Sequence, residues 1–118
     1  MTMKRRRKIR YRGRANIAGL NIKKYREALI PPCSQNDLAG KLQLAGLSVH
    51  KNMVSMIEIG RQGISDIELR TFAQVLGVTV SDLMDESIYK DDTHKAPIEY
   101  SEDSYDVGIA SVAEKPKK

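Results

Sequence analysis

Apolar residues recur at intervals of three and four between residues 17 and 85 and become sparse toward both ends of the chain. This spacing is typical of one face of an α-helix. It predicts five short helices, over residues 17–29, 35–43, 51–59, 65–76 and 81–85. No stretch alternates apolar and polar residues as a half-buried strand does. The predicted fold class is therefore all-α, a five-helix globule of about seventy residues, which is small but able to fold alone.

Local signals mark several of the predicted helix ends. Pro31 and Pro32 disfavour helical geometry in the preceding residue, so the first helix should end near residue 29. Ser34 precedes the second helix, where its hydroxyl can accept a hydrogen bond from a free backbone amide. Ser65 is followed three residues later by Glu68, a pattern in which two side chains cap the first turn reciprocally. These signals divide the helical region into short elements joined by short turns.

Charge is distributed unevenly along the chain. The sequence has 20 Lys and Arg against 15 Asp and Glu, a net charge of +5. Residues 1–26 hold eleven basic and no acidic residues, which leaves a net charge of −6 on the rest. We expect residues 1–15 to form a flexible basic arm, residues 16–85 the folded domain and residues 86–118 a flexible tail, because both ends lack the apolar groups that stabilise a fold. A basic front favours a polyanion as partner, although a membrane surface would also attract it.

Several classes of function are disfavoured by what the sequence lacks. No apolar run approaches the ~20 residues of a spanning helix, and the basic front lacks the apolar stretch of a secretory signal. We therefore expect a cytoplasmic protein with no membrane partner. Cys33 is the single cysteine, and His50 and His94 are the only histidines, so nothing has the spacing of metal ligands. Cys33 is interpreted as a small loop residue rather than a reactive thiol.

An enzyme is the least favoured class. The sequence offers no nucleophile paired with a base, no acid pair with a site behind it and no phosphate-binding glycine loop. We expect no cofactor and no small-molecule substrate.

Four short motifs follow one another between residues 22 and 84. They are Ile22-Lys23-Lys24-Tyr25-Arg26-Glu27, then Ser34-Gln35-Asn36-Asp37-Leu38-Ala39, then Val54-Ser55-Met56-Ile57-Glu58-Ile59-Gly60-Arg61, and last Leu69, Phe72-Ala73 and Leu76-Gly77-Val78. Their order and spacing resemble the helix-turn-helix family of phage Cro and lambda-type repressors, also called the xenobiotic-response-element family. The link over residues 44–49 is about five residues longer than in the shortest family members, and His50 stands where the family usually has a serine or threonine cap. The resemblance implies a five-helix, lambda-repressor-like domain over residues 16–85 that binds double-stranded DNA.

The resemblance also implies which residues read bases. The third helix, residues 51–59, would enter the major groove, because side chains near the N-terminus of such a helix reach base edges. The candidate base readers are Lys51, Asn52, Ser55 and Met56. Lysine can donate to guanine, asparagine can pair with adenine, and methionine can touch a thymine methyl group. The alternative interpretation is that these four residues form an ordinary solvated helix face.

A second group would hold the phosphate backbone. Ser34 and Gln35 lie at the start of the second helix, where free amides and a partial positive charge attract anions. Arg61, Gln62 and Gly63, just beyond the third helix, resemble a second backbone clamp. The alternatives are that Gln35 is only a surface residue and Gly63 only a turn.

The basic arm adds further candidates for phosphate or minor-groove contact. They are Lys4, Arg5, Arg6, Arg7, Lys8, Arg10, Arg12 and Arg14. Such a tract is also compatible with RNA binding, solubility or an expression artefact. Arg26 and Glu58 match family positions that form an ion pair between the first and third helices, so we interpret them as structural.

The predicted function is a sequence-specific transcriptional regulator, a repressor that occupies an operator, with a weak homodimer forming on DNA. The alternative is a protein-binding module such as the antitoxin of a toxin pair. In that case the acidic tail over residues 91–114 would embrace a basic partner.

Overall fold

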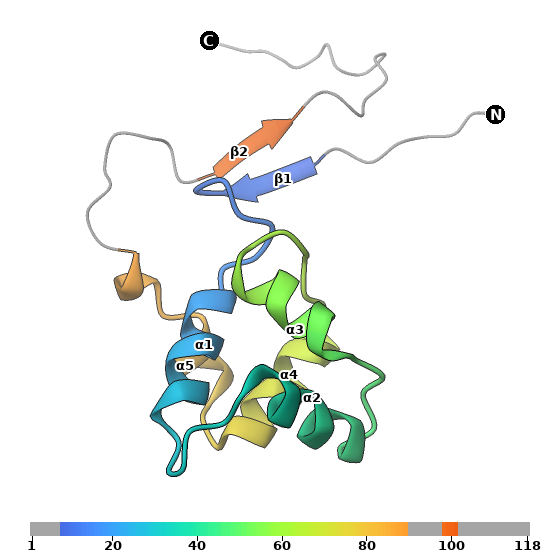
Figure 1. Ribbon diagram of the computed structural model, residues 1–118. Helices are drawn as coiled ribbons and strands as arrows, with labels where there is room; N and C mark the ends of the chain where they lie inside the picture. The colour runs from blue at the N-terminus through green and yellow to red at the C-terminus, as the bar shows by residue number, and fades with distance from the viewer. Residues whose placement is uncertain (1–7, 90–97, 102–118) are drawn as a thin grey trace, which may run out of the picture.

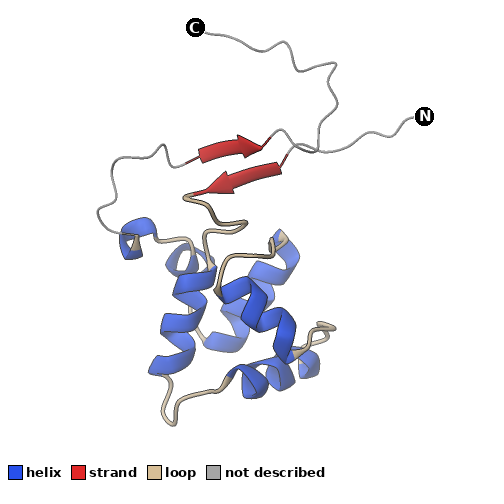
Figure 2. Cartoon of the chain, turned by 45° about the horizontal axis from the view of Figure 1, so that its top comes forward, coloured by secondary structure: helices blue, strands red, loops and turns tan. Residues whose placement is uncertain are grey.

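The computed structural model describes residues 8–89 and 98–101. Its elements follow the chain in this order: β1 Lys8–Tyr11, α1 Gly19–Ala28, α2 Gln35–Leu44, α3 Lys51–Glu58, α4 Asp66–Leu76, α5 Val80–Leu83, the 3₁₀ turn η1 Glu86–Ile88 and β2 Ile98–Ser101. The five helices pack together, and β1 and β2 lie side by side at one end of this helical body (Figures 1 and 2). The prediction of five helices in these places is confirmed, with ends that differ by no more than two residues.

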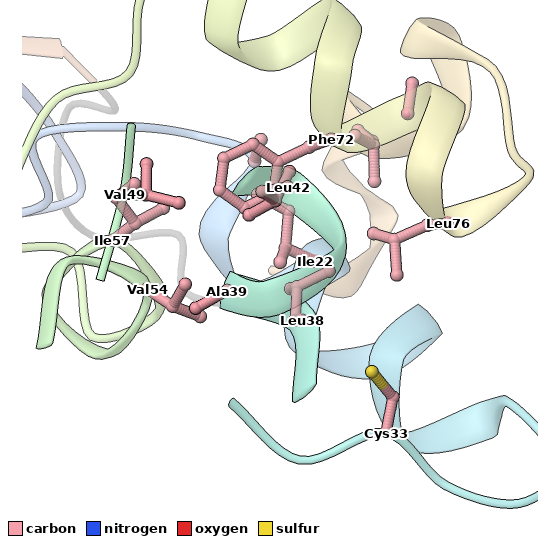
Figure 3. Packing of buried hydrophobic residues seen from close by; sticks show 13 residues of the cluster. Ile22, Cys33, Leu38, Ala39, Leu42, Val49, Val54, Ile57, Phe72 and Leu76 are labelled. Carbon is pink, nitrogen blue, oxygen red and sulfur yellow. The ribbon is translucent and has the colours of Figure 1, made fainter. Parts of the chain in front are cut away.

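The core lies where the helices converge. Ile22 of α1, Leu42 of α2 and Phe72 of α4 are fully buried and contribute to one apolar cluster (Figure 3). On the side of α3, Val54 and Ile57 enter the same cluster. Because α3 buries this side, its opposite side faces solvent.

The predicted helix caps are present. Ser34 accepts a hydrogen bond from the amide of Asp37 at 2.9 Å, and the Asp37 carboxylate accepts one from the Ser34 amide. Ser65 and Glu68 make the same reciprocal pair at the start of α4. Capping of this kind satisfies amides that have no partner inside the helix, so each of these helices begins where the local sequence predicts.

The strands correct the all-α prediction. β1 pairs with β2 in antiparallel register, with Arg10 opposite Glu99 and Tyr11 opposite Ile98. The fold is therefore mostly helical with a small two-stranded sheet. Each strand has only four residues, and apolar and polar residues do alternate in both, as Lys8-Ile9-Arg10-Tyr11 and Ile98-Glu99-Tyr100-Ser101. The pattern is as short as a strand signal can be, and the pairing joins two segments that lie far apart in the sequence, so the sheet was not predicted.

The sheet also changes the predicted domain limits. Residues 8–15 and 86–89, predicted to belong to a flexible arm and tail, belong to the folded part of the chain. The rest of the predicted arm and tail, residues 1–7, 90–97 and 102–118, lies outside the described residues.

Two tyrosines tie β1 to the segment that follows α5. The Tyr11 hydroxyl donates to Glu86 Oε1 at 2.8 Å, and the Tyr11 and Tyr89 rings meet edge to face with centroids 5.1 Å apart. The Tyr89 hydroxyl donates to the Ile17 carbonyl at 2.6 Å, and burial raises the pKa of this phenol. An isolated two-stranded sheet is marginal in water, so these contacts help to hold β1 beside the helical body.

None of the helices within residues 8–89 has the length and apolar content needed to cross a membrane.

Candidate nucleic-acid interface

The third helix has one buried and one solvent-facing side. Val54, Ile57 and Glu58 are buried, whereas Lys51, Asn52 and Met56 are exposed and Ser55 is half-buried. The structure therefore brings all four predicted base readers onto or beside one open side of α3. Apolar and polar residues separate on this helix in the way its sequence predicts.

The N-terminal end of α3 is open. His50 occupies the N-cap position with an extended backbone, but its side chain makes no capping hydrogen bond. The first residues of the helix, Lys51 and Asn52, are exposed. A helix N-terminus carries a partial positive charge and outward-pointing amides. This end of α3 thus combines a lysine, an amide side chain and a favourable environment for an anion.

The C-terminal end of α3 is bound tightly by the chain segment before α1. The Arg14 guanidinium donates to the Glu58 carbonyl at 2.7 Å. The side-chain nitrogen Nδ2 of buried Asn16 donates to the Ile57 carbonyl at 2.9 Å and to the Gln62 carbonyl at 2.8 Å. These donors bind carbonyls of the last turn of α3 and of the loop that follows it, so they hold this end of α3 in place.

A glycine allows this close approach. A Cβ atom at Gly19 would overlap the Ile57 carbonyl oxygen and the Arg14 guanidinium. The Gly19 amide also donates to Asn16 Oδ1 at 2.7 Å. Asn16 therefore joins the first turn of α1 to the last turn of α3, and only glycine at position 19 leaves room for the junction.

A buried ion pair forms a second attachment at the same end. Arg26 Nε and Nη2 donate to the two carboxylate oxygens of Glu58 at 2.7 and 2.9 Å. Arg26 is 7 % exposed and Glu58 is 3 % exposed. The hydrogen bonds to Glu58 raise the pKa of Arg26, against the lowering effect of burial. The predicted structural pair between α1 and α3 is confirmed.

Two further groups join this pair. Arg26 Nη1 donates to the Cys33 carbonyl at 2.8 Å, and Gln35 Nε2 donates to Glu58 Oε1 at 2.9 Å. Cys33 is buried in the α1–α2 loop, and burial raises the pKa of its thiol, which agrees with its interpretation as a small loop residue. The side-chain nitrogen of Gln35, a predicted phosphate contact, is thus directed into the domain.

The other predicted phosphate contacts are placed differently. Ser34 is exposed and caps α2, and Arg61 is exposed just beyond α3. Gln62 is half-buried, and its backbone carbonyl accepts a hydrogen bond from Asn16. Gly63 is exposed.

The predicted arm is divided by the fold. Arg10 lies in β1, the Arg12 guanidinium lies 5.5 Å from the centroid of the Tyr11 ring, and Arg14 binds α3 carbonyls. Arg14 is therefore a structural residue rather than part of a free basic arm. The residues Lys4, Arg5, Arg6 and Arg7 lie outside the described residues.

Sequence reasoning missed two buried asparagines. Asn16 joins α1 to α3, and Asn21 Nδ2 donates to the carbonyls of Leu83 and Asp85 at 2.9 and 2.8 Å at the end of α5. Asn16 precedes an apolar helical pattern, which is a recognisable cap signal. Asn21 carries no such signal, because its partners lie far away in the chain.

Within residues 8–89 and 98–101, no three His, Cys, Asp or Glu side chains gather in a way that could hold a metal ion. Comparison of the chain with protein-family models, with curated proteins and with solved structures finds no match.

Proposed function

We propose that this chain binds double-stranded DNA in a sequence-specific manner and acts as a transcriptional repressor that occupies its site. The observation that carries the proposal is the contrast between the two ends of α3. Lys51 and Asn52 are exposed beside an uncapped N-terminus, while the other end is bonded to the domain. A helix presented in this way fits the major groove. In this proposal α2 and α3 are the two helices of a lambda-repressor-like helix-turn-helix.

The exposed side of α3 has the chemistry for reading base edges. Lys51 can donate to O6 or N7 of guanine, and Asn52 can pair its donor and acceptor with adenine. Met56 offers an apolar surface to a thymine methyl group, and half-buried Ser55 adds a hydroxyl beside it.

Phosphate contacts would then flank α3. The start of α2 would offer the Ser34 hydroxyl and the Gln35 backbone amide, and Arg61 and Gln62 follow the other end of α3. The arm residues before β1 would supply further contacts to the backbone or to the minor groove.

The experiment compares affinity for a duplex selected from random DNA with affinity for a scrambled duplex, at several salt concentrations. Lys51→Ala or Asn52→Ala should cost about 1 to 3 kcal/mol on the selected duplex and relax the preference at one base pair. Alanine at Lys4, Arg5, Arg6 or Arg7 should weaken binding to both duplexes. Each such arm variant should reduce the salt slope by about one for every phosphate that the protein no longer neutralises.

Lys23→Ala is the matched control, because Lys23 is an exposed lysine on α1 rather than on α3. It removes the same charge and should leave the base preference unchanged. If the Lys51 and Asn52 variants lose equal affinity for both duplexes, or lose none, α3 is not the reading helix.

A further inference from the structure

The outer side of α2 carries an apolar surface that the DNA proposal does not use. This α2 outer surface consists of Ile30, Asn36, Asp37, Gly40, Lys41 and Leu44, which line an open groove of about 650 Å³ between α2 and the α1–α2 loop. Ile30 is 96 % exposed and Leu44 is 90 % exposed. Large apolar side chains grouped in this way mark interaction sites more often than single exposed ones do.

Gly40 gives an independent reason to expect a partner here. It lies in the middle of α2, and glycine is the least favourable residue in a helix interior after proline. A Cβ atom at Gly40 would meet nothing within 4 Å, in contrast to Gly19, where it would overlap neighbouring atoms. Nothing described in the fold therefore requires glycine at position 40. Close approach by a second molecule would require it.

The charges on this surface match a copy of itself. Asp37 and Lys41 lie one turn apart on α2, and both line the groove. In a two-fold symmetric contact the same surface is used by both protomers. A surface whose charges all have the same sign would repel a second copy of itself. A surface that carries both signs can place each charged side chain near an opposite charge of the partner.

We propose that a second copy of this chain docks on the α2 outer surface. The two α2 helices cross near Gly40, and Ile30 and Leu44 of one protomer cover the apolar groove of its partner. The opposite side of α2, with Leu38, Ala39 and Leu42, is buried in the core, so docking leaves the domain intact. The proposal does not depend on DNA binding, and its test contains no DNA.

The test is sedimentation velocity of the full chain over concentrations from micromolar to millimolar. The wild-type chain should show a reversible monomer–dimer equilibrium. Leu44→Glu should raise the dimer dissociation constant at least tenfold, because it removes apolar contact and brings like charges together. The control is Ile67→Glu, which adds the same charge at a residue on α4 that is 69 % exposed, and it should leave the dissociation constant unchanged.

Gly40→Ala separates docking from folding. Alanine favours the helix and meets no neighbour in the monomer, so it should raise the melting temperature of the monomer. The same methyl group should weaken the dimer at least threefold, because it stands where the helices cross. A chain that stays monomeric throughout overturns the proposal. So does a dimer weakened by Ile67→Glu and not by Leu44→Glu, or a Gly40→Ala chain whose dimer is unchanged.

Discussion

The two ends of α3 differ in the hydrogen bonds that they make with the rest of the chain. At the C-terminal end, the last turn is held by buried hydrogen bonds from Asn16 and Arg26 and by a partly buried one from Arg14. At the N-terminal end, His50 makes no side-chain cap and the following residues are exposed. A helix of eight residues is too short to be stable on its own. The attachment at one end therefore positions a helix whose other end stays open to a ligand.

The difference between the ends also predicts which substitutions act on folding and which act on binding. A buried polar group left without its partner costs free energy that an exposed group does not. Changes at the C-terminal end should therefore lower the free energy of unfolding. Changes at the N-terminal end should alter binding and leave folding almost untouched.

The largest effect is expected at the buried ion pair. Glu58→Ala leaves the Arg26 guanidinium buried without its carboxylate partner, and such a change costs about 3 to 5 kcal/mol of unfolding free energy. Urea unfolding followed by circular dichroism measures it. Glu27→Ala is the control, because the Glu27 carboxylate lies 3.8 Å from Arg26 but its side chain is 56 % exposed, and it should cost less than about 1 kcal/mol. Equal losses in the two variants would show that the pair does not hold α3.

Asn16→Ala should have the next largest effect. It removes the donor to the Ile57 and Gln62 carbonyls and the acceptor of the Gly19 amide. Because these groups are buried or half-buried, the loss of unfolding free energy should be about 2 to 4 kcal/mol. Asn52→Ala makes the same chemical change at the exposed end of α3, and a surface substitution there should change unfolding by less than about 0.5 kcal/mol. If the two alanine variants lose the same unfolding free energy, the C-terminal end of α3 is not held more firmly than its N-terminal end.

The helices were predictable because their signals are local. Ser34 and Ser65 stand next to the amides that they cap, and the apolar spacing of each helix can be read within about eleven residues. The pairing of β1 with β2 has no such signal, since its partners come from opposite ends of the chain. The Arg26–Glu58 pair followed from a resemblance to a family, because spacing alone does not bring these two positions together.

Composition alone does not predict which arginines of the basic front have a structural role. Its arginines are alike in sequence, so Arg14 was predicted to act with its neighbours. The fold distinguishes Arg14, because the turn after β1 brings its guanidinium to the Ile57 and Glu58 carbonyls. The cap that Asn16 makes to the Gly19 amide has a local signal, but its bonds to the Ile57 and Gln62 carbonyls do not, because these partners come from a distant part of the chain.

The smallest effect is expected at the N-terminal end of α3. His50→Ser places a hydroxyl at the N-cap, where it can accept a hydrogen bond from the first turn of α3. It should raise the free energy of unfolding by about 1 kcal/mol. His50→Asp should stabilise α3 by a similar amount, because a carboxylate both caps the helix and favours its positive end. Urea unfolding of the three chains measures both gains.

The same two variants should separate in DNA binding, measured on one duplex at low salt. Both close the open end of α3 with a cap, but only aspartate adds a negative charge beside the expected position of the phosphates. His50→Asp should therefore bind more weakly than His50→Ser, and the difference should shrink as added salt screens the charge. If neither variant unfolds at higher urea than the wild type, the N-terminus of α3 already has a partner. If both bind DNA equally at every salt concentration, this end of the helix does not face the phosphate backbone.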